Sequence, residues 1–337
     1  MRIVAPYVKY VQNTNNYEHI AKAARICYAA EQKNKPDYVF TEELWTKRNH
    51  RSPYRHGTLY YEISASFTRI LNMMIHSPYC TCVYIKEEYS YFISTNCQFV
   101  RELDGAFLLT LDNFSISEEY LNAMIIKYPQ LKDIVRVSFE IQTQISTSRE
   151  LNRVSPNAIC EQSTRFCNFS KDKYENHVRF CQPHWFDALT DINDKQHEYI
   201  DIYTDEENGI IKQKYNDEEE KYYGNPTFAA IGHSGFSDEE DQPAFVPLID
   251  EWVNAALDSE YRYFKMLKGG MLPQDARGVL MLDAATKCFY TYSIKEWKHI
   301  LDLRYKGTTG KPHPNAKIIA EEIYNVLKQL DLLYNYE

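Results

Sequence analysis

The stretch SRELNRVSPNAICEQSTRFCNFSKDKY, residues 148–174, is the segment around which the rest of the chain is organised. Arg149 and Arg153 are four residues apart, so a helix places them on one face. Pro156 ends that helix, because proline has no N–H to donate and its ring crowds the preceding turn. The polar residues 161–165 then offer hydroxyls, an amide and a guanidinium. Such a set suits an anion carried on a hydrogen-bonding body, such as a nucleotide.

The segment before this stretch has the clearest strand pattern in the chain. Val135, Val137, Phe139 and Ile141 alternate with polar residues, which predicts a half-buried strand that leads into the arginine-bearing helix. Further strands are predicted over residues 2–9 and 59–67. A hairpin is predicted where residues 83–85 and 89–93 flank a short charged turn.

Capping residues and apolar stripes predict the helices. Ser117 is a typical N-cap, and Ser293 with Glu296 forms a capping box before a helix that runs to Arg304. Thr41 is another N-cap candidate, for a helix to residue 48. Other helices are predicted over residues 17–30, 118–127, 247–267 and 314–333, and one more begins at Pro273.

Composition limits the functional class. The chain has 337 residues, a formal net charge of −9 and a pI near 5.7. This acidity argues against a general nucleic-acid binder, which would show a basic field, but it allows a nucleotide at one arginine cluster. The cysteines include no Cys-x-x-Cys pair, and a chain of this size needs no disulfides, so we expect a reduced, cytoplasmic protein. We expect no signal peptide and no membrane-spanning segment, and therefore no membrane partner.

Two other segments stand out. Residues 50–58 place two histidines and two arginines in a loop bearing proline and glycine, which forms either a compact polar site or a merely solvated loop. Residues 187–241 are rich in Asp and Glu and show no period, which predicts an acidic insertion, partly mobile, with a local hairpin at most. A metal-binding acidic loop is the sharper alternative, but no EF-hand spacing is present, so no metal site is expected.

Four segments resemble the flavin-dependent thymidylate synthases. Residues 161–173, EQSTRFCNFSKDK, resemble a segment typical of that family closely, and residues 149–153 resemble the helix end before it. Residues 272–280 and 292–304 resemble two further family helices. The chain departs from the family at the Arg-His-Arg triplet, which reads Arg153-Val154-Ser155 here. It also has Ala158 in place of a serine, and Arg55 in place of a glutamate.

The resemblance implies an α+β fold with an antiparallel or mixed sheet wrapped by helices. It implies a single domain over residues 1–337, with a family-branch insertion over 68–134 and the acidic insertion over 187–241. The implied reaction is the reductive methylation of dUMP to dTMP. The implied cofactor is FAD, with NADPH and methylenetetrahydrofolate as co-substrates, and the implied assembly is a homotetramer with sites shared between subunits.

The resemblance also assigns residues. Arg304 is implied as the catalytic residue that polarises the pyrimidine. The implied dUMP site consists of Glu150, Arg153, Glu161, Gln162, Ser163, Thr164, Arg165, Arg277 and Arg304. The implied FAD and folate contacts are His50, Ser52, Arg55, His56, Ser155, Lys295 and His299.

Three alternatives stay open at this point. The chain is an active flavin-dependent thymidylate synthase, a diverged flavoenzyme acting on another deoxynucleotide or one-carbon donor, or a non-catalytic nucleotide-binding homologue. The altered triplet and Arg55 keep the second and third open, and the triplet predicts weaker FAD binding than is usual in the family. Ser163 has no histidine base beside it in the sequence, which favours binding over a nucleophilic role.

Overall fold

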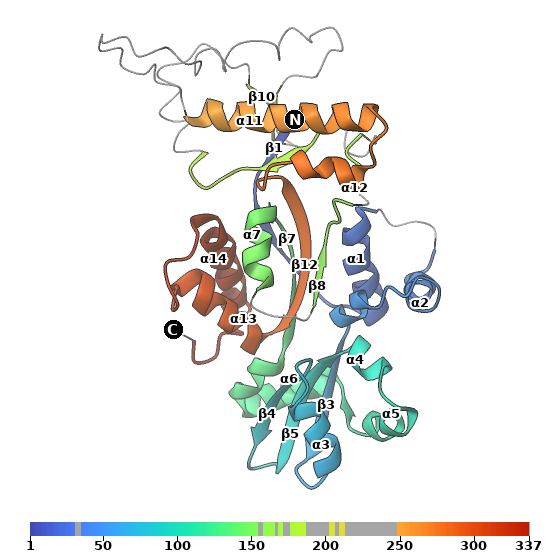
Figure 1. Cartoon of the computed structure of the whole chain (residues 1–337). Helices are drawn as coiled ribbons and strands as arrows, with labels where there is room; N and C mark the ends of the chain where they lie inside the picture. The colour runs from blue at the N-terminus through green and yellow to red at the C-terminus, as the bar shows by residue number, and fades with distance from the viewer. Residues whose placement is uncertain are drawn as a thin grey trace, which may run out of the picture. The chain divides into compact units, whose positions relative to one another are not determined.

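The computed structural model of the chain describes residues 1–30, 35–153, 158–165, 168–170, 176–186, 202–205, 209–212 and 248–336 (Figure 1). These residues form two compact units. The smaller unit comprises Met1–Ala5 and Thr164–Ala285, and the larger unit comprises Pro6–Ser163 and Thr286–Glu337. The prediction of one domain over residues 1–337 concerns how these units join, and it stays a prediction.

The smaller unit contains a mixed four-stranded sheet in the order β10-β11-β1-β9. The central strand β1 is parallel to β9 and antiparallel to β11, and β11 forms an antiparallel pair with β10. This pair is the local hairpin expected inside residues 187–241; the rest of that segment lies outside the described residues. The elements are β1 (Arg2–Val4), β9 (Arg179–Cys181), β10 (Ile202–Asp205), β11 (Gly209–Lys212), α11 (Leu248–Lys268), α12 (Pro273–Ala276) and the 3-10 turn η4 (Arg277–Val279).

A buried carboxylate ties α11 to the sheet of the smaller unit. Glu260 has no exposed surface, and its side chain accepts a hydrogen bond from the backbone N–H of Val178 at 3.2 Å. It also lies 3.0 Å from the amino group of Met1 and 3.5 Å from Nδ1 of His177. A buried carboxylate needs such partners, because removing it from water without them is costly.

The larger unit contains two four-stranded sheets. One has the order β2-β7-β12-β8, and the other has the order β4-β5-β3-β6. The pairs β2–β7 and β12–β8 are antiparallel, and so are all pairs of the second sheet. The strands are β2 (Tyr7–Val11), β3 (Thr58–Ser64), β4 (Thr81–Ile85), β5 (Ser90–Asn96), β6 (Ser115–Ile116), β7 (Arg136–Gln144), β8 (Ile159–Glu161) and β12 (Ala285–Ser293). The α+β fold with antiparallel and mixed sheets is therefore confirmed.

Helices cover these sheets. They are α1 (Asn16–Tyr28), α2 (Asp37–Thr46), α3 (Thr68–Ile75), α4 (Cys97–Arg101), α5 (Gly105–Asp112), α6 (Glu118–Lys127), α7 (Ile145–Asn152), α13 (Ile294–Leu301) and α14 (Pro314–Gln329). The short turns are η1 (Ser52–His56), η2 (Pro129–Ile134) and the π-helical turn η5 (Asp302–Lys306).

The main core of the larger unit forms where α13 packs on β7 and β12. Trp297 is almost fully buried, and its ring lies 5.1 Å from that of Phe139 and 5.0 Å from that of Tyr292. Its indole N–H donates to the carbonyl of Val137 at 3.0 Å, so the polar edge of the ring is also satisfied. Truncating a side chain in such a position typically costs ~3–5 kcal/mol.

Three predicted elements differ in the structure. Residues 2–9 form two strands, β1 and β2, because Ala5 and Pro6 separate them and each joins a different sheet. Thr41 is not an N-cap: α2 begins at Asp37, and the Thr41 hydroxyl donates to the carbonyl of Tyr38 inside the helix at 3.1 Å. The strand predicted over residues 59–67 ends at Ser64, before α3.

Candidate functional site

Arg304 lies in η5, one turn after the end of α13. The helix α13 begins with the predicted capping box, in which Ser293 and Glu296 exchange hydrogen bonds. It continues into η5, and such π-helical turns are frequent at functional sites. Arg304 donates from Nε and Nη2 to the backbone carbonyl of Glu150 at 3.2 and 2.9 Å. This carbonyl belongs to the last turn of α7, so the guanidinium is held at the C-terminal end of that helix.

Gly307 ends the π-helical turn that carries Arg304. Its φ is 73°, in the left-handed region that favours glycine. A Cβ atom at this position would lie 2.9 Å from the carbonyl oxygen of Gly310. The chain can therefore turn away directly after Arg304 only with glycine here.

Glu161 receives two hydrogen bonds from α7. Ser148 Oγ donates to Oε1 at 2.8 Å, and Asn152 Nδ2 donates to Oε2 at 3.3 Å. Tyr290 on β12 donates its hydroxyl to Oδ1 of Asn152 at 2.8 Å. Burial raises the pKa of the Tyr290 phenol far above its usual value, so this hydroxyl keeps its proton. Arg304 and Glu161 are thus both anchored on α7.

The residues after β8 are fixed by their backbone. Gln162 N–H donates to the carbonyl of Lys287 at 2.8 Å, and Ser163 N–H donates to the carbonyl of Cys27 at 3.1 Å. These bonds join the segment to β12 and to the last turn of α1. The side chains of Gln162 and Ser163 are half-buried.

The smaller unit brings three predicted dUMP residues together. Arg277 Nη1 donates to the Thr164 hydroxyl at 2.8 Å, and Arg165 Nε donates to Oε1 of Gln274 at 3.0 Å. Both guanidinium groups are exposed. Gln274 belongs to α12, which begins at Pro273 because proline suits the first helical turn, and Arg277 begins η4 directly after it. Two planar cations beside a hydroxyl and an amide can bind a phosphate.

The turn η1 and the residues just before it carry four of the residues predicted for FAD and folate. His50 Nδ1 lies 2.9 Å from the hydroxyl of Tyr28, and burial lowers the pKa of His50. Arg55 Nε donates to Oε1 of Gln98 at 2.9 Å, and its guanidinium lies 5.3 Å from the ring centre of Tyr79. Arg55 therefore has defined neighbours of its own in the position where the family has a glutamate. Ser52, the first residue of η1, is half-buried.

His56 belongs to the core of the larger unit. Its side chain has no exposed surface, and Nδ1 lies 2.9 Å from the Thr291 hydroxyl. That hydroxyl lies 2.7 Å from Oγ of Ser138, which in turn lies 2.7 Å from Nε2 of His19. Burial lowers the pKa of both histidines, so each ring is neutral at pH 7. The four residues form one buried chain of hydrogen bonds that joins η1, β12, β7 and α1.

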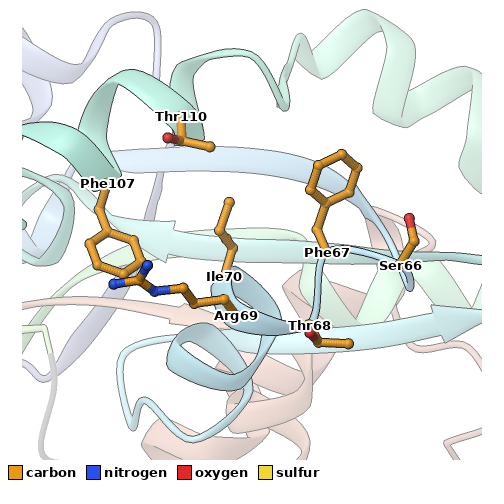
Figure 2. A pocket seen from close by; sticks show the side chains of 7 residues that line it. All are labelled: Ser66, Phe67, Thr68, Arg69, Ile70, Phe107 and Thr110. Atoms are coloured by element: carbon orange, nitrogen blue, oxygen red, sulfur yellow. The ribbon is translucent and has the colours of Figure 1, made fainter.

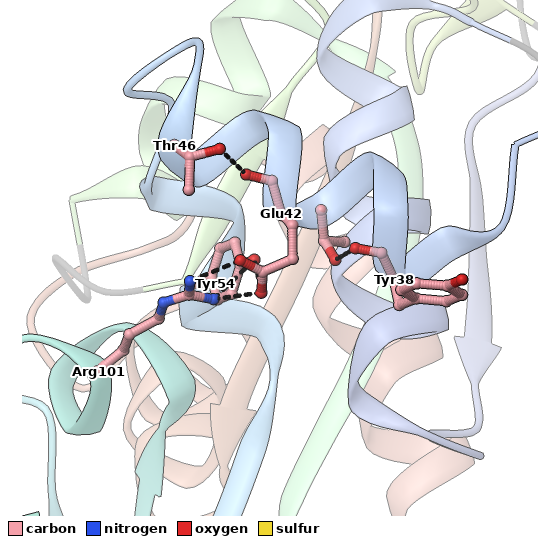
Figure 3. Close-up of polar contacts among 6 residues, drawn as sticks. Tyr38, Glu42, Thr46, Tyr54 and Arg101 are labelled. Atoms are coloured by element: carbon pink, nitrogen blue, oxygen red, sulfur yellow. Dashed lines mark hydrogen bonds and ion pairs between the residues drawn. The ribbon is translucent and has the colours of Figure 1, made fainter.

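A cluster of charged and aromatic side chains fixes η1 against α2 and α4 (Figure 3). Arg101 on α4 makes a bidentate ion pair with Glu42 on α2, at 2.5 and 2.6 Å. The Arg101 guanidinium also lies 4.5 Å from the ring centre of Trp45 and 5.2 Å from that of Tyr54. Since Tyr54 belongs to η1, the cluster holds the loop that carries the predicted cofactor residues.

The remaining predicted residues are more isolated. Lys295 and His299 are exposed on α13, where their spacing of four residues places them on one face. Among the described residues, neither side chain hydrogen-bonds to another predicted site residue. Arg153 is the exposed C-cap of α7, and Ser155 lies outside the described residues together with Val154.

Several neighbours of the site were missed by sequence reasoning. Ser148 and Asn152 had a detectable signal, because residues four apart on α7 share one face, and that face meets Glu161. Gln274 sits in a segment that was recognised, but only the fold pairs it with Arg165. His19, by contrast, lies 119 positions from Ser138 in sequence, so no local pattern could reveal their contact.

The described residues contain no group of three or more His, Cys, Asp or Glu side chains arranged to hold a metal ion. Within the same part of the chain, no helix combines the length and the apolarity needed to cross a bilayer. What the arrangement offers is cationic and hydrogen-bonding recognition of an anionic, polar ligand.

Known proteins resemble this chain in structure and in sequence. Two solved structures are similar over 98% of this chain, both of the UMP/dUMP methylase PolB from Streptomyces cacaoi. The complex with 5-Br dUMP is 13% identical to this chain, with a TM-score of 0.40 and 93% of its own chain covered. The complex with 5-Br UMP is also 13% identical, with a TM-score of 0.39 and 92% of its own chain covered. No curated protein matches the chain. The sequence pattern of the family described as "Thymidylate synthase complementing protein" matches residues 121–331. Since this match spans more than half of the chain and includes the arginines at 153, 165, 277 and 304, the chain belongs to that family.

Proposed function

We propose that the protein is a flavin-dependent thymidylate synthase, which methylates dUMP to dTMP with methylenetetrahydrofolate, FAD and NADPH. The observation that carries this proposal is the placement of Arg304. Two hydrogen bonds to the Glu150 carbonyl hold its guanidinium in a fixed position on α7. A fixed cation of this kind stabilises negative charge as it develops on a pyrimidine ring, and it does so without reorganising during the reaction.

The nucleotide contacts follow from the two arginine-bearing clusters. Thr164, Arg165 and Arg277 are assigned to the phosphate, because both arginines are exposed and Arg277 contacts the half-buried Thr164 hydroxyl. Glu161 is assigned as an acceptor of hydrogen bonds from the nucleotide, because its carboxylate is held in place by α7. In the proposed homotetramer, the clusters that contact one nucleotide can come from different subunits.

The residues present fit part of a flavin site. Lys295 and His299 are exposed on one face of α13, and a lysine beside an imidazole suits the diphosphate of a dinucleotide. The buried ring of His56 does not reach a ligand at the surface in this conformation, so its proposed part is to position η1. When bound, FAD supplies the hydride that completes the methyl group. The contribution of this chain is to bind and orient the nucleotide and to polarise it through Arg304.

Formation of dTMP tests the proposal. The full-length protein would be incubated with dUMP, methylenetetrahydrofolate, FAD and NADPH, and nucleotides would be identified by mass spectrometry. The proposal expects dTMP, and none when any one component is omitted. A parallel reaction with UMP separates the diverged flavoenzyme from the synthase. Binding of dUMP without any product would overturn the proposal in favour of a non-catalytic homologue.

A further inference from the structure

A cavity lies in the larger unit, at the join between β3 and α3 and against α5 (Figure 2). Its volume is about 370 Å³, at the lower end of the range of small-molecule sites, ~300–1,000 Å³. Every residue that lines it lies between positions 66 and 110. The family match begins only at residue 121, so this cavity belongs to a part of the chain outside the matched segment.

The walls of the cavity are apolar and aromatic. Phe67 and Phe107 face it from opposite sides, and Ile70 lies between them (Figure 2). The Phe67 ring is fixed by an edge-to-face contact with Phe114, with ring centres 4.8 Å apart, yet 46% of its surface remains exposed. An exposed, fixed aromatic face beside an aliphatic floor favours a flat apolar ligand.

One cation stands at this cavity. The guanidinium of Arg69 lies over the ring of Phe107, 5.1 Å from its centre, which holds it in a defined plane. Arg69 forms no ion pair with any residue in the described ranges, whereas Arg101 and Arg262 each pair with a carboxylate. A planar guanidinium without an acidic partner matches a carboxylate, sulfonate or phosphate group.

Hydroxyl groups complete the lining. Ser66, Thr68 and Thr110 surround the apolar walls with groups that can donate or accept hydrogen bonds (Figure 2). An apolar pocket with a few polar groups placed around it is the usual composition of a small-molecule site. From these three features we propose that the cavity binds a small organic anion, in which a flat ring carries one acidic group. None of the residues that line it belongs to the proposed nucleotide or cofactor sites.

Titration with 1-anilinonaphthalene-8-sulfonate, an aromatic sulfonate, tests the site in the full-length protein. Wild type should show saturable fluorescence enhancement, together with a shift of the Ile70 methyl resonance, which Ile70→Val assigns. Arg69→Gln should weaken binding at least ten-fold, and Thr110→Trp, which fills the cavity without changing charge, should abolish the methyl shift. Arg262→Gln, an exposed arginine of the smaller unit, is the matched control and should titrate as wild type.

Circular dichroism and thermal melting establish that each variant is folded, and the side chains of Arg69 and Thr110 are exposed. Arg69→Lys keeps the charge but loses the planar fork, so its affinity should lie between wild type and Arg69→Gln. The proposal is overturned if wild type shows no saturable binding. It is equally overturned if Arg69→Gln and Thr110→Trp titrate as wild type, which would place the probe elsewhere.

Discussion

Single arginine side chains carry the proposed recognition of the phosphate. Arg277→Gln and Arg165→Gln should each weaken dUMP binding about ten- to a hundred-fold, because a hydrogen bond to a charged group contributes ~1.5–3 kcal/mol. Calorimetric titration of dUMP into the full-length protein measures the change. Arg262→Gln alters an exposed arginine of the same unit that pairs with Asp258, and it should bind as wild type. Equal affinities for Arg277→Gln and Arg262→Gln would remove Arg277 from the site.

His19 makes the larger unit sensitive to acid. Burial, aided by the positive charges of Lys22 and Arg136, lowers the pKa of His19 from 6.5 to about 4. Between these values the unfolded chain binds a proton that the folded chain does not. The contribution of the neutral His19 ring to stability is therefore fully present above pH 6.5 and is lost as the pH falls toward 4. The difference between the two pKa values corresponds to roughly 3 kcal/mol.

Urea denaturation at pH 7 and at pH 4.5 measures this loss. His19→Gln keeps a hydrogen-bonding group near Ser138 but cannot take up the proton, so it should lose less stability between the two pH values than wild type. Part of the remaining dependence would come from His56 and His50, whose pKa values are also lowered by burial. An equal loss in wild type and variant would show that His19 is not the source.

The start of α13 is decisive at the scale of elements, because this helix leads to Arg304. Ser293 is fully buried; it caps the helix with Glu296 and also accepts a hydrogen bond from Thr81 at 2.9 Å. Ser293→Ala should lower the free energy of unfolding by about 1–2 kcal/mol, because it leaves the half-buried Thr81 hydroxyl and the Glu296 N–H without their acceptor. Ser117→Ala removes the exposed cap of α6, where water can replace the hydroxyl, and should cost less. Chemical denaturation that ranks the two variants in reverse would contradict this account.

Elements whose cause is local could be predicted from the sequence. The alternation from Val135 to Ile141 gave β7, the Ser117 cap gave α6, and the capping box at Ser293 gave α13. The prediction of Thr41 as an N-cap was wrong, because a threonine hydroxyl can also donate to a carbonyl inside a helix. The N-cap of α2 is Pro36 instead. Strand order and the split of residues 2–9 depend on distant partners and are invisible to local patterns.

In the candidate site, too, some features could be predicted from the sequence and others could not. The arginines could be found because they stand in segments that resemble a family, and the structure pairs Arg277 with Thr164. What could not be predicted is how each side chain is held. Arg304 bonds to a carbonyl 154 positions away, and His56 bonds to a hydroxyl 235 positions away. Such contacts arise from the packing of the whole unit.

At the scale of the whole molecule, the proposal predicts a homotetramer. Its motivation is that the predicted nucleotide residues lie on distant segments and, by the family resemblance, converge across subunits. Light scattering coupled to size-exclusion chromatography should give four times the chain mass of 39.8 kDa. Dilution should reduce mass and activity together. A species of 39.8 kDa that retains full activity would contradict the shared site.

The central claim is that this chain replaces the hydrogen at C5 of dUMP with the help of Arg304. Its most direct test is release of tritium from dUMP labelled at C5, with methylenetetrahydrofolate, FAD and NADPH present. The account predicts steady release by wild type, a loss of at least about a hundred-fold in Arg304→Gln, and normal release in Arg262→Gln, an exposed arginine paired with Asp258. No release by wild type, or equal release by wild type and Arg304→Gln, would contradict it.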